Sequence, residues 1–225
     1  MIQTLVLKLK VFGAFIALIK DPNKTEKIFK ISDIARKRNA DKAELSVAPI
    51  LNDERFKKLF AEKYNPLIDI STLRTLPEGT FGNTVARFLD KNGFEPNSFP
   101  MIDGDRPLDY LVSRLRQTHD LYHVLTGYGT GVPDELALQS FMIPQIGSLL
   151  SVMLISGGLL HLILFHPLSA VSTFDKMIEG YLLGKQSKKL IMLRLEEEWT
   201  TELDVLRLKL GMNTNKVQQL ITQSA

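Results

Sequence analysis

The chain has 225 residues, with 28 Lys and Arg against 25 Asp and Glu, which gives a formal net charge of +3. This length suffices for one large domain with a sizeable core or for two small ones. A nearly balanced charge, with no basic patch interleaved with aromatic residues, argues against nucleic acid as a partner. The chain has no cysteine. Disulfides, thiolate zinc sites and iron–sulfur clusters are therefore excluded, and any metal must be held by nitrogen and oxygen.

The N-terminal stretch, residues 2–19, is mostly apolar but contains Lys8 and Lys10. A secretory signal would place basic residues first and a small-residue cleavage site after the apolar run, and this pattern is not seen. We expect a helix that packs on the domain or touches a membrane. Asp21-Pro22 should end it.

Residues 23–65 have the apolar spacing of helices separated by short polar breaks. Between Asn52 and Lys63, for example, Phe56 and Leu59 fall on one face and are expected to face the core. Residues 76–82 are rich in turn formers and lead into a helix predicted from Asn83 to Lys91, which Asn92-Gly93 should end.

The most informative stretch begins at His119-Asp120, in a helix predicted from about Pro107 to Thr126. His119 and His123 are four residues apart, so they point from the same face of this helix. Two imidazoles on one face can chelate one metal ion, as in helices that carry zinc.

A short loop follows the two histidines. Gly127, Gly129 and Gly131 should end the helix, and Pro133 suits the first turn of the next one. A short connection between helices usually makes them antiparallel neighbours, which would return Glu135 beside the histidines. The pattern then predicts a metal held by two nitrogens and one or two carboxylate oxygens. The alternative is a helix with ordinary histidines and a Glu135 that complements the helix dipole.

None of residues 136–174 is Asp, Glu, Lys or Arg, and Gln145 to Phe165 is long enough to span a bilayer, which takes about 20 apolar residues. No Lys/Arg cluster flanks the run, and serines and glycines dilute it. We therefore expect the buried centre of an all-α domain. Gly157-Gly158 either kinks the helix or leaves room for something else, such as a lipid tail, and the alternative to a ligand is that the glycines only let two helices pack closely. His161 and His166 are further candidate ligands, with core or helix-end positions as the alternative.

The C-terminal part returns to mixed character. We predict a helix from Phe174 to Leu183 that ends at Gly184, then a long helix from Gln186 to Leu210 with Glu196-Glu197-Glu198 on its solvated face. Alternating runs joined by hairpin turns are not seen, and neither are repeats. The predicted fold is all-α, a helical bundle around the central uncharged apolar helix, forming a single domain over residues 1–225.

The sequence His-Asp-x-x-His, followed by eleven residues and Glu, resembles the signature of the coenzyme Q (ubiquinone) biosynthesis protein 4 family. The resemblance implies that His119, Asp120, His123 and Glu135 hold a divalent metal. Zinc is the first expectation, with iron or manganese as alternatives. Other parts are also similar to the family: Asp21-Pro22, the segment from Leu76 to Gly82, Arg114-Leu115-Arg116 and an acidic helix near the C-terminus.

The family resemblance further implies work on the ring of a polyprenylated 4-hydroxybenzoate-derived intermediate. The expected reaction removes the carboxyl group from ring carbon 1, in some accounts replacing it with a hydroxyl. Asp120 is the nearest candidate proton donor, and it could equally be a fourth ligand or a partner of one. Arg116, one turn before His119, could hold the substrate carboxylate, with a solvated surface arginine as the alternative.

A second interpretation is a non-catalytic organiser that holds a prenyl lipid and gathers other quinone-biosynthesis enzymes at the membrane. A zinc hydrolase of the HExxH kind fits less well, because Asp120 is shorter than the usual glutamate base. Under either main interpretation, the expected partners are an isoprenoid lipid, a membrane surface and other pathway enzymes, with a homodimer as a possible assembly. The expected location is peripheral, on the cytoplasmic side of a bacterial membrane or the matrix side of the mitochondrial inner membrane.

Overall fold

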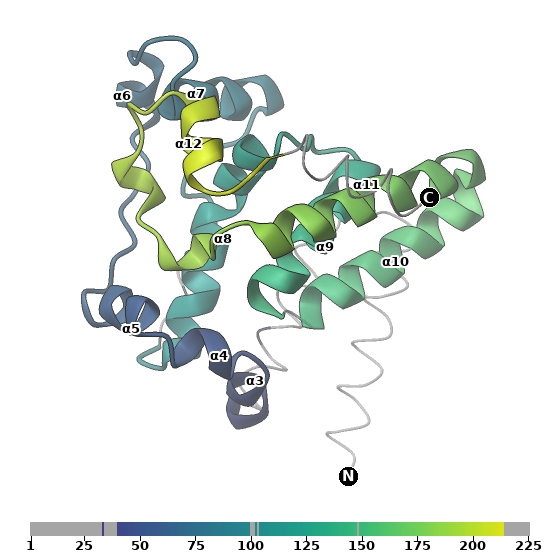
Figure 1. Ribbon diagram of the computed structural model, residues 1–225, viewed down its shortest axis with the longest axis horizontal. Coiled ribbons are helices and arrows are strands. Elements are labelled where there is room, and N and C mark those ends of the chain that lie inside the picture. Colours follow the sequence, from purple (N-terminus) through teal and green to yellow (C-terminus); the bar gives the residue numbers. More distant parts are fainter. Residues whose placement is uncertain (1–32, 34–39, 100–101, 103, 148, 214–225) are drawn as a thin grey trace. The chain divides into compact units, whose positions relative to one another are not determined.

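The computed structural model describes residues 33, 40–99, 102, 104–147 and 149–213 (Figure 1). Every regular element in this part of the chain is helical, and its β-type pairing is an isolated bridge between Thr80 and Glu202. The predicted all-α class is confirmed. The helix predicted over residues 2–19 lies outside the described residues.

The described elements run in the following order along the chain. They are α3 (Ala40–Ser46), α4 (Ala48–Leu51), α5 (Glu54–Ala61), α6 (Ile70–Arg74), α7 (Phe81–Asn92), α8 (Pro107–Thr126), α9 (Val132–Ile146), α10 (Leu149–Phe165), α11 (Pro167–Gln186), the 3₁₀ helices η1 (Leu190–Met192) and η2 (Leu195–Glu197), and α12 (Leu203–Lys209).

By their internal contacts, the described residues divide into two compact units. The first unit comprises residues 40–47 and 129–182, and it contains α9, α10 and most of α11. The second unit comprises residues 48–128 and 183–213, with α4 to α8, both 3₁₀ helices and α12. The predicted single domain over residues 1–225 stays a prediction.

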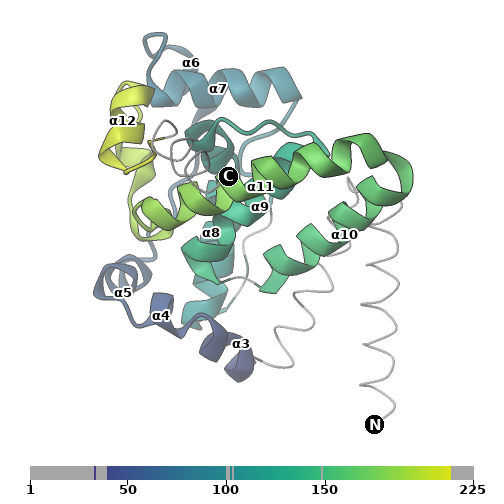
Figure 2. The same cartoon turned by 45° about the vertical axis from the view of Figure 1, so that its right-hand side comes forward.

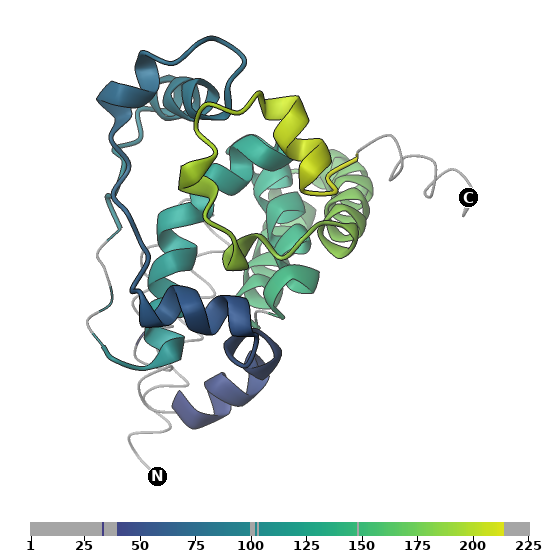
Figure 3. The same cartoon turned by 60° about the vertical axis from the view of Figure 1, so that its left-hand side comes forward.

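The second unit is built around α8 (Figure 3). Near the start of α8, the ring of Tyr110 packs on Phe56 and Phe60 of α5, with centroids 5.6 and 5.7 Å away. Near its end, α7 places Phe88 against His123. Helix α8 therefore buries side chains on several faces, because neighbours surround it within this unit.

The ends of α8 follow the local signals in the sequence. Pro107 occupies the first helical position, where its missing N–H costs nothing. Gly127 ends the helix with φ +81°, a left-handed conformation that side chains rarely adopt, and its N–H donates to the carbonyl of His123 at 2.8 Å. The predicted bounds of this helix are confirmed.

The turn-rich segment at residues 76–82 is hydrogen-bonded to a distant part of the chain. The N–H groups of Phe81 and Gly82 donate to the carbonyls of Thr201 and Trp199 at 2.8 and 2.9 Å. The rings of Phe81 and Trp199 stack, with centroids 5.2 Å apart. A Cβ on Gly82 would lie 2.6 Å from a methyl of Leu76 and 3.0 Å from the backbone carbonyl oxygen of Trp199, so this close approach favours glycine.

The predicted long helix from Gln186 to Leu210 is wrong. Helix α11 continues through Gly184 to Gln186, and two 3₁₀ turns precede the short α12. Glu196, expected on a solvated face, is buried and ion-paired with Arg114 of α8. Glu196 reaches that partner from a 3₁₀ turn instead of an α-helix, and tertiary pairing here outweighs local α-helix propensity.

The first unit packs α9, α10 and α11 around a small apolar core (Figure 2). The buried residues of this core are Leu136, Ile155, Leu162 and Ala170. The uncharged run is not one helix, since Gly147, at φ +76°, ends α9 before α10 begins. No helix in the part of the chain that the structure describes is long and apolar enough to cross a membrane.

Two glycines let the helices of the first unit approach closely. A Cβ on Gly158 of α10 would lie 2.5 Å from a methyl of Leu136 on α9. A Cβ on Gly180 of α11 would overlap the carbonyl of Ala137, also on α9. At Gly158, Leu136 fills the space above the glycine. This arrangement agrees with close helix packing, the alternative to a lipid groove.

Helices α10 and α11 also expose large apolar side chains. The expectation of a wholly buried apolar helix is therefore met on one side of α10 only. The exposed residues are Leu149, Val152, Leu160, Ile163, Leu164 and Phe165 on α10, and Leu168, Val171, Phe174, Ile178 and Tyr181 on α11.

Candidate metal centre

Three possible ligands lie together on α8. His119, Asp120 and His123 each offer one donor atom, and these atoms all lie within 4.8 Å of one another. The two imidazole rings meet edge to face with centroids 4.8 Å apart. His119 and Asp120 keep 29% and 23% of their side chains exposed, while His123 is buried. His119 and Asp120 are thus partly exposed to solvent, and His123 is not.

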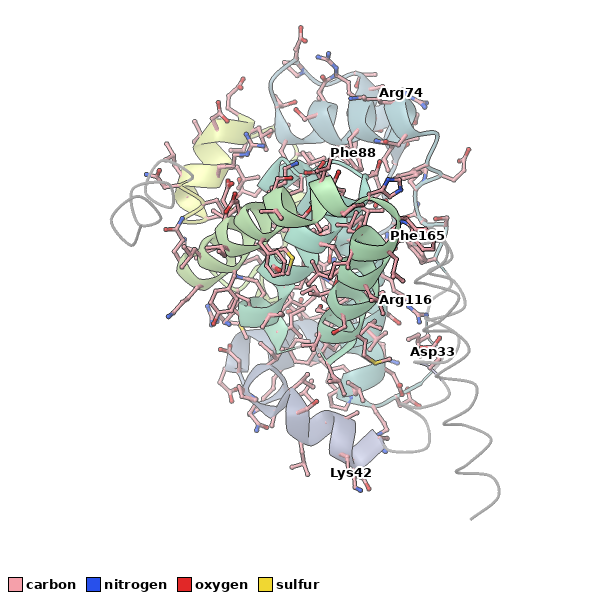
Figure 4. The ribbon with its side chains drawn as sticks, turned by 90° about the vertical axis from the view of Figure 1, so that its right-hand side faces the viewer. Asp33, Lys42, Arg74, Phe88, Arg116 and Phe165 are labelled. Atoms are coloured by element: carbon pink, nitrogen blue, oxygen red, sulfur yellow. The ribbon has the colours of Figure 1, made fainter. Side chains whose placement is uncertain are left out.

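The orientation of His123 is fixed by its neighbours. Its Nδ1 lies 3.1 Å from the carbonyl oxygen of Tyr128, an acceptor, so Nδ1 carries the proton and donates. In this tautomer Nε2 is the unprotonated nitrogen, the form in which an imidazole binds a metal. Phe88, labelled in Figure 4, stacks on the ring at 5.4 Å between centroids and an angle of 21°.

His119 and Asp120 are adjacent in sequence and near each other in space. His119 Nδ1 lies 3.5 Å from a carboxylate oxygen of Asp120. A carboxylate beside an imidazole favours its orientation and raises its basicity as a ligand. Asp120 can therefore support His119, or it can itself supply the third ligand atom.

The site lies in the last two turns of α8, where the helix dipole is negative and favours a cation. The carbonyls of this end have partners. Thr126 Oγ1 donates to the carbonyl of Tyr122 at 2.7 Å. Arg207 of α12 donates from Nε to Leu125 at 2.9 Å and from Nη2 to Val124 at 3.0 Å.

A buried polar network lies on another face of α8. Arg114 pairs through both terminal nitrogens with Glu196 and also donates to the carbonyl of Leu193 at 3.1 Å. Burial by itself lowers the pKa of Arg114, but the hydrogen bonds and charge of Glu196 raise it above its ordinary value. Thr118 and Tyr122 lie on the same helix, and burial raises the pKa of Tyr122 to about 12.

The other predicted site residues are placed as follows. Glu135 lies in the first turn of α9, in the first unit, and its role as a ligand stays a prediction. Arg116, labelled in Figure 4, is half-buried on α8, three residues before His119, and its role also stays a prediction. Gly157 and Gly158 are buried in α10, where Leu136 covers Gly158.

His161 and His166 do not form a three-ligand group among the described residues. Their rings lie 5.5 Å apart, and His161 is buried against Phe165 with centroids 5.1 Å apart. These positions match the core and helix-end alternative, and a role as extra ligands stays a prediction.

The donor set of α8 fits a divalent metal. Two imidazoles and one carboxylate from neighbouring turns provide borderline and hard ligands, which suit zinc, iron and manganese. If these three residues alone bound the metal, a position would stay open for substrate or water, as is typical of catalytic sites.

Comparison with known families identifies the chain. A family model described as coenzyme Q (ubiquinone) biosynthesis protein Coq4 matches residues 3–216, nearly the whole sequence. The chain belongs to the Coq4 family. The resemblance seen at the His-Asp-x-x-His motif therefore extends over both units of this Coq4 chain.

Individual relatives agree with this assignment. A mitochondrial ubiquinone biosynthesis protein coq4 from Aspergillus fumigatus is 34% identical over 149 residues, covering 62% of this chain and 49% of its own length. The mitochondrial mouse COQ4 homologue is 31% identical over 150 residues, covering 65% and 55%. The chain thus spans about half the length of the curated relatives that it matches.

A solved structure supports the Coq4 fold. A crystal structure of a protein named for ubiquinone biosynthesis, from Nostoc punctiforme, aligns with a TM-score of 0.77 and 28% identity. The alignment covers 92% of this chain and 98% of that one.

Sequence reasoning missed three groups that shape the Coq4 site. Phe88 and Arg207 come from α7 and α12, and only the fold brings them to α8. Tyr128 acts through its backbone carbonyl, which carries no sequence signal, although its position between Gly127 and Gly129 marks the turn that makes the contact.

Proposed function

We propose that this Coq4 chain is a metal-dependent carboxy-lyase of coenzyme Q biosynthesis. The observation that carries the proposal is the convergence of His119, Asp120 and His123 on α8, where the Tyr128 contact makes Nε2 the unprotonated nitrogen of His123. The proposed substrate is a polyprenylated 4-hydroxybenzoate-derived ring, a proposal that is supported by the family's name.

A bound divalent metal would supply Lewis acidity, fixing and polarising a carboxylate or ring oxygen of the substrate. His119 and His123 would hold it, and Asp120, in the same helix, would serve either as a further ligand or, unbound and protonated, as the proton donor. Glu135 is proposed as an additional ligand because of the sequence spacing alone.

Two side chains are proposed to handle the substrate. Arg116, one turn before His119, would pair with the ring carboxylate, since a guanidinium matches a carboxylate with two parallel hydrogen bonds. In the reaction the bond between ring carbon 1 and the carboxyl carbon breaks, carbon dioxide leaves, and its bonding electrons stay on carbon 1. Where Asp120 is not a ligand, its protonated carboxyl group would deliver the proton that carbon 1 then takes.

The competing course replaces the carboxyl group with a hydroxyl. It needs dioxygen and two electrons from a reductant, whereas simple loss of carbon dioxide needs one proton. The product separates the two, because simple decarboxylation in heavy water places deuterium on carbon 1, and the oxidative course places there an oxygen atom from dioxygen.

The test of the proposed activity uses purified protein, a short-chain ring analogue and added zinc, iron or manganese. We expect carbon dioxide release that His119→Ala/His123→Ala abolishes together with metal binding. Asp120→Asn divides its roles: retained metal with lost turnover indicates a proton donor, while lost metal indicates a ligand. Wild-type protein that binds metal and lipid without turning over any ring analogue would instead favour the non-catalytic organiser.

We further propose that the exposed apolar residues of α10 and α11 contact the lipid phase, which would make the protein peripheral to a membrane. Support comes from the absence of any charged residue over residues 136–174, combined with exposed Leu168 and Val171 near the start of α11. A surface that binds a protein usually has a polar rim and hydrogen-bonding groups, whereas a surface that contacts acyl chains needs only apolar groups. Relatives named mitochondrial support a mitochondrial location in eukaryotes, where we propose the matrix side of the inner membrane.

The lipid proposal is tested by flotation with phosphatidylcholine vesicles. We expect wild-type protein to float and Leu168→Lys/Val171→Lys to lose most of this binding. Leu208→Lys, at an exposed position on α12, is the matched control and should float like wild type. If wild type does not float but forms a dimer that the double variant abolishes, the apolar surface serves a second copy and the lipid proposal fails.

A further inference from the structure

One arginine joins α12 to the end of the metal-bearing helix. Arg207 donates from Nε to the carbonyl of Leu125 at 2.9 Å and from Nη2 to that of Val124 at 3.0 Å. These carbonyls belong to the last turn of α8, where a helix leaves carbonyls without intrahelical donors. One planar guanidinium therefore completes two adjacent backbone groups.

The clamped carbonyls are close in the chain to the group that orients His123. After them, Gly127 donates its N–H back to the carbonyl of His123 at 2.8 Å, and Tyr128 N lies 3.4 Å from Thr126 Oγ1. This turn aims the Tyr128 carbonyl at His123 Nδ1, 3.1 Å away. The direction of that carbonyl is thus set by the same turn that Arg207 holds.

Arg207 is itself held in place. At the start of α12, Leu203 donates its N–H to the carbonyl of Gly79 at 2.9 Å. Within the helix, Leu206 is buried, and Asp204 accepts a hydrogen bond from Arg207 Nη1 at 3.1 Å. The turn-rich segment before α7 therefore anchors α12, and α12 presents its guanidinium to α8.

We propose that Arg207 is a positioning residue for the metal centre: by clamping the last turn of α8, it holds the Tyr128 carbonyl on His123 and keeps Nε2 of His123 as the metal-binding nitrogen. This inference rests on the metal-binding part of the proposed function. Arg207 is 82 positions from Leu125, whose carbonyl it binds, and it is not one of the proposed ligands. Partners that orient a ligating histidine typically change metal affinity about 10- to 100-fold when they are removed.

The test compares full-length wild type with Arg207→Gln, Arg207→Lys and the control Arg74→Gln. Arg74 pairs with Asp90 in the same unit, and both side chains are about half exposed, so the control removes a similar charge without touching α8. Two readouts are used on each protein. The first is the tautomer of His123 in metal-free protein, from nitrogen-15 shifts at about pH 8.5, where an ordinary histidine is neutral. The second is the zinc dissociation constant, from competition with a chelator.

We expect wild type and Arg74→Gln to carry the His123 proton on Nδ1, with equal zinc affinity. Arg207→Gln should mix the tautomers and weaken zinc binding at least about tenfold. Arg207→Lys should recover part of both, because an ammonium can bond one of the two carbonyls. It also serves as the test variant if Arg207→Gln does not fold.

Two results separate this inference from the proposed function. If the folded Arg207 variants keep the Nδ1 tautomer and bind zinc within about twofold of wild type, the positioning role is overturned. The expected loss of zinc affinity is at least about tenfold, or about 1.4 kcal/mol of binding free energy. If wild type binds no zinc but Arg207→Gln still disturbs the His123 tautomer, the positioning role stands, and the metal-dependent function is what fails.

Discussion

The two units of this Coq4 chain are stabilised in different ways. In the second unit, α8 is held by charged and polar groups from distant segments, with Glu196 on Arg114 and Arg207 on the last turn. In the first unit, α9 to α11 are joined by apolar contacts and glycine close approaches, and large apolar side chains remain exposed. A buried polar network specifies one arrangement because each group needs its partner. Apolar contacts have no such pairing requirement, so an apolar surface tolerates many arrangements.

The difference matches what each unit is proposed to do. Metal ligands must be held to a fraction of an ångström, which requires the neighbours of each ligand to be fixed as well. Contact with acyl chains needs only apolar area, and it is insensitive to the exact direction of a side chain. The comparison can be tested by perturbing the polar network, the buried tyrosines and the glycine contacts in turn.

The largest effect is expected from the buried ion pair of the second unit. Arg114→Met leaves the Glu196 carboxylate buried without its partner, which typically costs about 3–5 kcal/mol in the free energy of unfolding. Arg74→Met, which breaks an exposed pair with Asp90, should cost less than about 1 kcal/mol. Urea unfolding followed by circular dichroism gives both values.

The matched double variant tests whether the loss comes from the orphaned charge. Arg114→Met/Glu196→Leu removes both charges and should recover most of the stability that Arg114→Met loses. A loss below about 1 kcal/mol for Arg114→Met alone would contradict a second unit held by this pair.

A smaller effect is expected at alkaline pH. Burial raises the pKa of Tyr122 to about 12 in the folded protein, against an ordinary value of about 10. The raised pKa means that the contribution to stability is complete below about pH 10 and is lost as the pH rises through about 12. Two pKa units correspond to about 2–3 kcal/mol.

Urea unfolding at about pH 9 and pH 12 measures this loss as a difference in the free energy of unfolding. Tyr122→Phe should show a smaller difference, because its side chain cannot ionise. Tyr181→Phe, at an exposed position of the first unit, is the control and should leave the pH dependence unchanged. The assignment to Tyr122 is refuted if both variants lose stability with pH as wild type does.

The smallest effect is expected from the glycines of the first unit. Gly180→Ala forces α11 away from the Ala137 carbonyl, and this overpacking should lower the free energy of unfolding by about 1–3 kcal/mol. The higher helix propensity of alanine should offset about 1 kcal/mol of that loss. Gly158→Ala should cost less, because a Leu136 methyl can rotate away. Ser172→Ala, exposed on α11, is the control in thermal unfolding. If both glycine variants are more stable than wild type, the helices are not closely packed, and a lipid groove at Gly158 becomes the better interpretation.

Local signals predicted the features that depend on neighbouring residues. Pro107 and Gly127 gave the bounds of α8, because a first-turn proline and a left-handed glycine act within one turn of the helix. The spacing of His119 and His123 gave their common face in the same way. The family motif then identified the chemistry to which that pair belongs.

Features that depend on distant residues could not be predicted. Glu196 was expected on a solvated helix face, because nothing near it in sequence indicates its partner Arg114, 82 residues away. Arg207 and Phe88 reach α8 only through the fold. Glu135 differs from both, since its return to the histidines was inferred from the glycine turn and stays a prediction.

The most direct test of the account is anomalous diffraction from crystals grown with zinc, with data collected at the zinc absorption edge. We expect one strong peak bonded to Nε2 of His123 and to a nitrogen of His119, at about 2.0–2.1 Å from each, with Tyr128 still accepting from Nδ1. Occupied zinc bound elsewhere in the chain, with none between these two imidazoles, would contradict the metal centre on α8.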